Sequence, residues 1–308
     1  MIMTYALAIH GGAGTIDRAQ LTPELEKQYI EGLQKAIEAG ETILKNNGTA
    51  MDAVCASVCA LEDHPLFNAG RGAVFTSDGT HEMDAAVMDG KDQNVGAIAG
   101  VCGPKNPILL ARKVMEQTDH AFIIGDSLHD IAQSNQLVMK PSDYFFTQKR
   151  WDALQETLLL QKQGKVSDDP AVRHGTVGAV ALDKDGNVAA ATSTGGMTGK
   201  LPGRVGDSPV IGGGTFASNG TCAVSATGYG EIFMRFTAAA DVSSRMRFLG
   251  EDLGSAATHV VMEELLPNDG TGGLIAVDNK GNISMPFNSS GMYRGSVSSK
   301  SDMMVAIF

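Results

Sequence analysis

The sequence predicts an α+β fold in which mainly antiparallel strands are sandwiched by helices. Two pairs of β-rich runs are each joined by a short Gly-Asn turn, 184–187 in the first pair and 280–282 in the second. Short glycine-containing turns of this kind join antiparallel strands. Helical apolar stripes and single strands precede the hairpins, and this order fits the predicted class better than a doubly wound parallel sheet.

The first half of the chain begins with a buried strand, Tyr5 to Ile9, which runs into a glycine-rich loop, HGGAG at 10–14. Thr22-Pro23 then predicts the start of a helix that continues to Asn46. Thr49 with Asp52 predicts a capping box that opens a second helix. The later elements are expected as a strand at 95–101, a helix from 107 to 116, a strand at 120–125 and a helix at 127–136.

Residues 61–90 lie between these elements and carry several glycines among short β-rich pieces. The stretch is either an ordered loop whose carbonyls converge on a cation or a set of turns. Glu82, Asp84 and Asp89 alternate with apolar residues. This alternation predicts a strand with one polar face more simply than a metal site.

The character of the chain changes after Trp151, where a helical stretch gives way to a polar, Pro-containing segment with the composition of an exposed linker. The linker ends at Thr176, at the start of the first hairpin. The elements expected beyond it are strands at 177–182, 188–193, 274–277 and 283–285 and helices at 231–245 and 252–265.

Composition limits the classes of function. The 24 basic and 35 acidic residues give a net charge of 24 − 35 = −11, which argues against nucleic acid or an anionic membrane as a partner and favours small polar substrates. No apolar run reaches the length of a membrane span and the N-terminus has no basic region, so a soluble cytoplasmic protein is expected. Four cysteines without a CxxC pair are expected to be reduced, buried thiols: Cys55, Cys59, Cys102 and Cys222.

Gly175-Thr176, where the linker meets the hairpin, is the candidate reactive site. A threonine hydroxyl needs a base to act as a nucleophile, and the histidines offer no recognisable triad partner; His10 adjoins a glycine loop and His174 lies in the linker. If the peptide bond before Thr176 were cut, the new α-amine, with an unperturbed pKa of about 7.7 to 8.0, could accept the hydroxyl proton. Gly-Thr before a strand is common, but here hydroxyl- and glycine-rich motifs accompany it.

Six motifs together resemble the plant-type, isoaspartyl-peptidase class of L-asparaginases, which are N-terminal-nucleophile hydrolases. The motifs are HGGAG (10–14), PLFNAGRGAVF (65–75), MDAAVMDG (83–90), GTVGAVALD (175–183), TSTGGMTGKLPGRVGDSP (192–209) and ATGYGE (226–231). The resemblance implies a four-layer αββα sandwich with two mainly antiparallel sheets, made as one domain of residues 1–308. It also implies autocleavage into an α subunit, 1–175, with a linker at about 161–175, and a β subunit, 176–308, two pairs of which form a dimer of αβ heterodimers.

The resemblance also implies roles for single residues. Thr176 matches the nucleophile and Thr194 the hydroxyl that supports it. Thr227 and the N–H of Gly228 would form an oxyanion hole, in which donors face developing negative charge. Asn68 is expected near the nucleophile.

The substrate pocket follows from the same motifs. Arg204 would bind the substrate α-carboxylate, for which a planar fork of donors is well suited. Asp207 would hold the α-ammonium, and Gly228 and Gly230 would line the pocket. Outside the motif, Arg204 and Asp207 would be interpreted as a surface ion pair.

No organic cofactor is implied, but a structural sodium ion is. The family binds sodium through main-chain carbonyls in the loop that matches 61–71 here. The corresponding residues are Leu61, Glu62, His64, Phe67, Ala69 and Arg71.

The expected reaction hydrolyses the side-chain amide of L-asparagine or the β-peptide bond of an isoaspartyl dipeptide through a β-aspartyl ester on Thr176. One alternative is a glycosylasparaginase of the same fold, which accepts a sugar on the amide nitrogen. Another is an uncut, inactive homologue that serves as a binding protein.

Overall fold

The strands of the protein form two sheets. A computed structural model describes residues 4–14, 16, 18, 21–165 and 175–308. The strands are β1 (Ala6–Gly14), β2 (Met83–Asp89), β3 (Val95–Val101), β4 (Phe122–Ile124), β5 (Val177–Leu182), β6 (Val188–Thr194), β7 (Thr215–Ala217), β8 (Cys222–Gly228), β9 (Gly272–Asp278), β10 (Ile283–Ser284), β11 (Gly291–Ser298) and β12 (Ser301–Ala306). Eight of them pair in the order β12-β11-β1-β5-β6-β2-β3-β4 and four in the order β10-β9-β8-β7. The described pairs are antiparallel except β3 with β4, so the predicted mainly antiparallel α+β class is confirmed.

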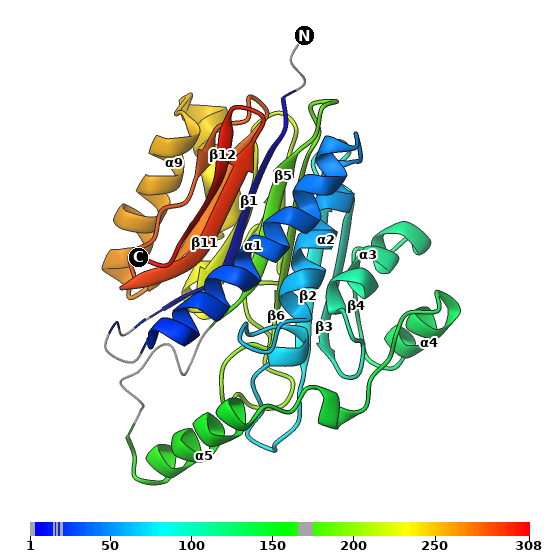
Figure 1. Cartoon of the computed structure of the whole chain (residues 1–308), viewed down its shortest axis with the longest axis vertical. Helices are drawn as coiled ribbons and strands as arrows, with labels where there is room; N and C mark the ends of the chain where they lie inside the picture. Colours follow the sequence, from blue (N-terminus) through cyan, green and yellow to red (C-terminus); the bar gives the residue numbers. More distant parts are fainter. Residues whose placement is uncertain (1–3, 15, 17, 19–20, 166–174) are drawn as a thin grey trace.

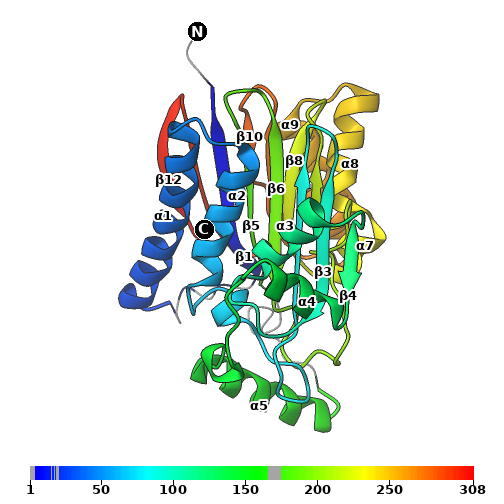
Figure 2. The ribbon, with the colours of Figure 1, turned by 90° about the vertical axis from the view of Figure 1, so that its right-hand side faces the viewer.

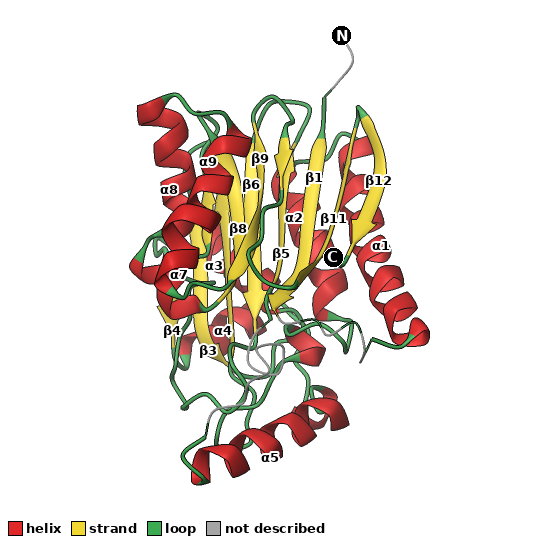
Figure 3. Cartoon of the chain, turned by 90° about the vertical axis from the view of Figure 1, so that its left-hand side faces the viewer, coloured by secondary structure: helices red, strands yellow, loops and turns green. Residues whose placement is uncertain are grey.

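Helices cover the outer face of each sheet. The helices of the first part of the chain, including α5 at one end of the molecule, are α1 (Pro23–Lys45), α2 (Ala50–Glu62), α3 (Pro107–Gln117), α4 (Ser127–Ser134) and α5 (Gln148–Lys162), with short 3₁₀ turns η1 (Gly70–Gly72) and η2 (Ser142–Tyr144). Those of the second part are α7 (Gly230–Arg235), α8 (Ala238–Ser244) and α9 (Leu253–His259), with π-helical η3 (Arg245–Leu249) and η4 (Val260–Leu265) and the 3₁₀ turn η5 (Leu266–Asn268). Figures 1 and 3 show α1 and α2 on one side of the strands and α7 to α9 on the other.

Three apolar clusters account for this layering. One lies between the first helices and the eight-stranded sheet, and a second lies between the four-stranded sheet and α7 to α9. The third lies between the sheets, where Ala6 and Val180 of one sheet share a cluster with Ala223 and Ile275 of the other. Small alanine side chains at this inner face let the two sheets approach closely.

The predicted helix starts and hairpins are confirmed. Thr22 Oγ1 accepts a hydrogen bond from the N–H of Leu25 at 3.2 Å, and Thr49 Oγ1 accepts one from the N–H of Asp52 at 3.1 Å, so both helices have side-chain N-caps. The hairpins β5–β6 and β9–β10 turn where the sequence predicts.

The motif HGGAG is part of a strand, which contradicts the predicted loop. β1 continues through Gly14 and pairs with β11, with an irregularity of register between His10 and Gly12. Gly12 has a φ of +112°, and a Cβ on Gly11 would lie 2.5 Å from the ring of Phe67. The glycines therefore provide the bulge and the close packing that β1 needs next to Phe67.

The prediction of one polar face in the region of Asp84 is wrong. β2 lies between β6 and β3 in the middle of the large sheet, and Asp84 is fully buried. Both faces of a central strand are covered here, so alternation in the sequence does not mark a solvent face.

The tertiary structure corrects three other predictions and places the C-terminal residues, for which no element was predicted. The helix expected at 231–245 is broken at Thr237, whose φ of 47° ends one helix and starts the next. The expected strand at 120–125 is reduced to β4. The C-terminal residues, which carry no recognised motif, form β11 and β12 at the edge of the large sheet. Cys102 is exposed and Cys59 is partly exposed, so only two of the four free thiols are buried.

The predicted linker at 161–175 lies mostly outside the described residues, because 166–174 are not among them. The helix that precedes it, α5, lies at one end of the molecule, below the sheets in Figure 2. Among the described helices, none combines the length and the apolar character needed to cross a membrane.

Candidate active site

Thr176 lies at the end of the large sheet where β5 begins, and it is 5% exposed. The residue before it, Gly175, has a φ of +154°, and a Cβ there would lie 3.1 Å from the Cβ of Asn68. This backbone conformation favours glycine. The Gly175-Thr176 pair is therefore held in a bend that few other residues would adopt.

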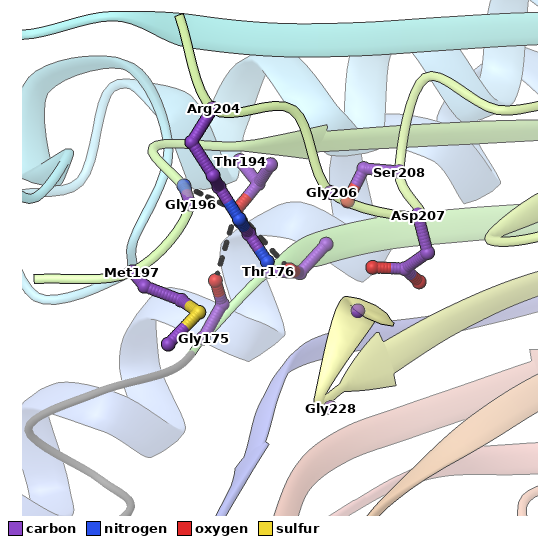
Figure 4. A pocket seen from close by; sticks show the side chains of 11 residues that line it. Gly175, Thr176, Thr194, Gly196, Met197, Arg204, Gly206, Asp207, Ser208 and Gly228 are labelled. Atoms are coloured by element: carbon purple, nitrogen blue, oxygen red, sulfur yellow. Dashed lines mark hydrogen bonds between the residues drawn. The ribbon is translucent and has the colours of Figure 1, made fainter. Parts of the chain in front are cut away.

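A chain of hydroxyl groups connects Thr176 to the carbonyl in front of it. The Thr176 hydroxyl donates to Thr194 Oγ1 at 3.1 Å, and the Thr194 hydroxyl donates to the carbonyl oxygen of Gly175 at 3.0 Å. The N–H of Gly196 donates to Thr194 Oγ1 at 2.9 Å. Figure 4 shows these three hydrogen bonds around Thr194. Thr194 Oγ1 thus accepts two hydrogen bonds, and its hydroxyl donates one to the Gly175 carbonyl.

Asn68 provides the second donor to the Gly175 carbonyl. Its Nδ2 donates to the carbonyl oxygens of Gly175 and Gly196, both at 2.7 Å, and its Oδ1 accepts from the N–H of Val74 at 2.9 Å. Because Asn68 is 1% exposed, these bonds are shielded from water. Two neutral donors therefore converge on one carbonyl oxygen, the geometry that stabilises negative charge developing on it.

A pocket opens beside the two threonines. Its lining consists of Gly175, Thr176, Thr194, Gly196, Met197, Arg204, Gly206, Asp207, Ser208, Gly228 and Gly230. Most of these residues are small or polar, and Arg204 and Asp207 are its charged groups (Figure 4). The residues come from three sequence-distant segments: the start of β5, the end of β6 with the segment after it, and the end of β8 with the start of α7.

Arg204 does not pair with Asp207 as a surface ion pair. Its Nε and Nη2 donate to the two carboxylate oxygens of Glu231 at 3.0 and 2.8 Å. This bidentate contact uses one edge of the guanidinium and leaves Nη1 for another acceptor. Glu231, at the start of α7, is a site residue that the sequence reasoning did not identify, although it stands in the quoted motif ATGYGE.

Asp207 is a buried carboxyl group that faces the pocket. It is 4% exposed and its Oδ2 is a buried oxygen without a hydrogen-bond partner among the described atoms. Burial raises the pKa of Asp207 to about 7, while Arg204 acts in the opposite direction. A Cβ on Gly230 would lie 2.7 Å from Asp207 Oδ1 and 3.2 Å from Arg204 Nη2, so glycine is needed where the two charged groups meet.

The predicted oxyanion pair is only partly in the pocket. Gly228 lines it, whereas Thr227 is fully buried and does not appear in the lining. Thr227 Oγ1 accepts from the N–H of Ala13 at 3.2 Å, and this contact leaves its own O–H as a possible donor.

His10 contacts the candidate nucleophile, which sequence reasoning did not anticipate. Its Nδ1 lies 3.0 Å from the carbonyl oxygen of Thr176 and its Nε2 lies 3.0 Å from Ser225 Oγ. Complete burial lowers the pKa of His10 to about 3, so the ring is neutral and holds the backbone of Thr176 without acting on its hydroxyl. The register of β1 with β5, which opposes His10 to Gly178, brings the ring to this position.

The loop predicted to hold sodium is tightly packed around its glycines. A Cβ on Gly70 would lie 2.5 Å from the Glu62 carbonyl oxygen, and one on Gly72 would lie 2.0 Å from the carbonyl oxygen of Phe67. The carboxylate of Glu62 points elsewhere, since Oε1 accepts from Ser193 Oγ at 2.6 Å. Among the described residues, no cluster of three or more His, Cys, Asp or Glu side chains could hold a metal ion.

A buried threonine hydroxyl, donors aimed at one carbonyl oxygen and a pocket with one cation and one buried carboxyl group are features that fit a hydrolytic enzyme. Comparisons with known proteins agree. A family model described as "Asparaginase" matches residues 3–307. The chain is 50% identical over 295 residues to an isoaspartyl peptidase of Escherichia coli, covering 94% of this chain and 91% of the relative. It is 44% identical over 322 residues to a putative isoaspartyl peptidase/L-asparaginase of Dictyostelium discoideum (94% and 92% covered) and 42% identical over 300 residues to a plant-type L-asparaginase of Thermococcus kodakarensis (93% and 94% covered).

The chain belongs to this asparaginase family, as the motifs predict. It is an enzyme of the hydrolase class.

Proposed function

We propose that the protein is a threonine-nucleophile amidohydrolase that acts on L-asparagine and on isoaspartyl dipeptides after cutting itself between Gly175 and Thr176. The observation that supports this most directly is the hydroxyl chain from Thr176 through Thr194 to the Gly175 carbonyl, beside a pocket that contains Arg204 and Asp207. The names of the relatives agree with both substrate classes.

Self-cleavage begins with attack of Thr176 Oγ1 on the carbonyl carbon of Gly175. As the new C–O bond forms, the Thr176 proton passes to Thr194 and the Thr194 proton moves to the Gly175 oxygen, on which Asn68 also donates. The C–N bond then breaks as the Gly175 carbonyl re-forms, and the proton on its oxygen passes to the nitrogen of Thr176. An ester now joins Gly175 to the side-chain oxygen of Thr176. Water hydrolyses this ester, which leaves a carboxylate on Gly175 and a free hydroxyl and α-amine on Thr176.

In the mature enzyme the α-amine is the base that the uncut chain lacks. With an unperturbed pKa of about 7.7 to 8.0 it accepts the hydroxyl proton near neutral pH. Thr176 Oγ1 then attacks the substrate β-carbonyl, and ammonia or an amino acid leaves with that proton. Water hydrolyses the resulting β-aspartyl ester to aspartate. Thr227 and the N–H of Gly228 are the proposed donors to the oxyanion of this second reaction.

The pocket selects an amino-acid zwitterion. The unpaired edge of the Arg204 guanidinium binds the α-carboxylate, and the buried Asp207 carboxylate binds the α-ammonium. Gly228 and Gly230 line the same pocket. An unpartnered carboxyl oxygen in a buried site is costly, and a substrate ammonium removes that cost.

The assembly follows from the same proposal. Cleavage divides the domain into an α subunit, 1–175, and a β subunit, 176–308, which stay together because β1 lies between β5 and β11. Two such pairs form a cytoplasmic dimer of heterodimers, and the two sheets with their outer helices form the four-layer αββα sandwich of N-terminal-nucleophile hydrolases.

The loop after α2 is proposed to bind a sodium ion through main-chain carbonyls. The six residues are Leu61, Glu62, His64, Phe67, Ala69 and Arg71. The ion would hold the loop that carries Asn68. A melting temperature that is equal in sodium chloride and choline chloride would refute this site.

Intact-mass analysis of the purified protein during incubation tests the main proposal. Two polypeptides that end at Gly175 and begin at Thr176 are expected, together with release of ammonia from asparagine. Thr176→Ala should stay whole and inactive, whereas Thr176→Ser, which keeps the hydroxyl, should still cut. A wild-type chain that remains whole, or a Thr176→Ala chain that is cut at the same bond, would overturn the proposal.

A further inference from the structure

Helix α5 contacts the loop that carries Asn68 through one side chain. Arg150, in the first turn of α5, donates from Nε to the carbonyl oxygen of Gly72 at 3.0 Å and from Nη2 to the carbonyl oxygen of Leu66 at 3.4 Å. These two carbonyls lie on either side of Asn68 in the sequence. One edge of a rigid guanidinium therefore joins the two arms of the loop.

The partners of Arg150 are neutral. None of the ion pairs found among the described residues includes it. A half-buried cation that faces the carbonyl oxygens of Leu66 and Gly72 favours the backbone conformation in which both carbonyls point toward it. Its two acceptors, Leu66 and Gly72, differ from the six carbonyls proposed for sodium, so both cations can act on the loop.

The start of α5 is itself fixed in place. Thr147 Oγ1 accepts from the N–H of Arg150 at 3.3 Å, and the ring of Trp151 packs edge-on against Phe75 at 5.3 Å between centroids. Beyond this end, only Leu154 and Thr157 of the helix are buried. Arg150 thus joins the start of α5 to the loop, whereas Leu154 and Thr157, further along the helix, pack near Gly199.

Asn68 depends on the loop backbone for its position. Its carbonyl oxygen accepts from the N–H of Gly195 at 3.1 Å and its side chain makes the three bonds described above. A hydrogen bond is lost when either atom moves by a fraction of an ångström beyond its usual range. A shift of the loop would therefore remove the Asn68 donor from the Gly175 carbonyl.

We infer that Arg150 is a positioning residue for self-cleavage: it holds the loop 66–72 so that Asn68 donates to the Gly175 carbonyl oxygen. The inference rests on the proposed function. Helix α5, which precedes the cleavage site in the sequence and is mostly exposed, thereby helps to fix the position of Asn68.

The test measures the first-order rate of self-cleavage by intact mass for wild type, Arg150→Met and Arg150→Lys. Arg150→Met should slow cleavage at least tenfold. Arg150→Lys keeps the charge but cannot donate to both carbonyls in the guanidinium geometry, so its rate should lie between those of the wild type and Arg150→Met. Lys149→Met is the matched control, because Lys149 is the neighbouring cation and its Nζ donates to Tyr29 Oη at 3.4 Å and not to the loop carbonyls described above; it should cut at the wild-type rate. Equal rates for Arg150→Met and wild type would overturn the inference and leave the proposed function intact, whereas a wild type that never cuts would remove the proposed function itself.

A double-mutant cycle separates positioning from general stability. If Arg150 acts through Asn68, Arg150→Met should slow cleavage much less on an Asn68→Ala background than on the wild-type background. Equal slowing on both backgrounds would show that Arg150 acts independently of Asn68 and would overturn the inference.

Two further measurements keep the test decisive if Arg150→Met folds poorly. The same cycle is run with Arg150→Lys, at a temperature well below the melting temperature of each variant. Guanidinium chloride at tens of millimolar should restore part of the rate of Arg150→Ala, and sodium chloride at the same ionic strength should not. Equal effects of the two salts would count against a specific guanidinium contact.

Discussion

Asp207 makes the affinity of the pocket for an amino-acid zwitterion depend on pH. Burial raises the pKa of this carboxyl group to about 7, and only the ionised form attracts an α-ammonium group. Below that pH the carboxyl must release a proton when the ligand binds, so affinity falls as pH falls. An exposed aspartate, which is ionised throughout this range, would give no such pH dependence.

The size of the effect follows from the pKa. The ionised fraction of Asp207 decreases tenfold for each pH unit below about 7, so the inhibition constant of a zwitterionic ligand should rise by the same factor. Between about pH 8 and pH 5 the expected rise is about 90-fold, equivalent to about 2.7 kcal/mol of binding free energy.

L-alanine as a competitive inhibitor of asparagine hydrolysis provides the assay, because its own charge is constant over this range. Asp207→Asn should bind L-alanine weakly and with little pH dependence, and this variant corrects for the other titrating groups of the site. An inhibition constant of the wild-type enzyme that does not change between about pH 5 and pH 8 would refute the assigned role of Asp207.

Three further predictions concern groups around the site. Glu231→Gln removes one charged partner of Arg204 and should raise KM for asparagine about tenfold with a smaller effect on kcat; steady-state kinetics on the matured enzyme would contradict this if KM were unchanged. Gly178→Ala places a Cβ 2.0 Å from Ser225 Oγ and 2.5 Å from His10 Nε2. Overpacking of this kind should lower the free energy of unfolding by about 1 to 3 kcal/mol in chemical denaturation. An unaltered denaturation midpoint would show that the neighbouring strands can move apart at no cost in stability. His10, with its pKa lowered to about 3, binds a proton more readily in the unfolded chain than in the folded one. Its contribution to stability is therefore present above about pH 6.5, and the free energy of unfolding should decrease by about 2 kcal/mol between pH 7 and pH 5 because of this residue. Chemical denaturation of His10→Gln at both pH values should lack this part of the decrease, and an equal decrease in wild type and variant would disprove the prediction.

Local sequence signals predicted the elements whose causes are themselves local. Thr22 and Thr49 accept backbone N–H groups a few residues away, so a helix start can be recognised from neighbouring residues alone. The same holds for the hairpins, in which Asp183 Oδ1 and Asp278 Oδ1 accept N–H groups within their own turns. These predictions were confirmed because the partners are close in the sequence.

Other elements depend on partners far along the chain and were predicted incorrectly or not at all. The glycine-rich segment after His10 is a strand because β11, from the C-terminus, pairs with it. Asp84 is buried because β6 and β3 flank β2, which the alternation of its neighbours does not reveal. The break at Thr237 has no glycine or proline to announce it.

The sequence by itself determined the candidate nucleophile, Thr176, and the residues expected around it, because the motifs stand together in one chain. It also indicated the base, because a threonine without a histidine partner needs the amine that cleavage would create. Only the tertiary structure decided which groups meet there. Asn68 and Thr194 both donate to the Gly175 carbonyl, and Glu231 occupies one edge of Arg204. Such contacts join residues that are up to 107 positions apart, and their geometry depends on strand register and loop packing, which sequence spacing does not encode.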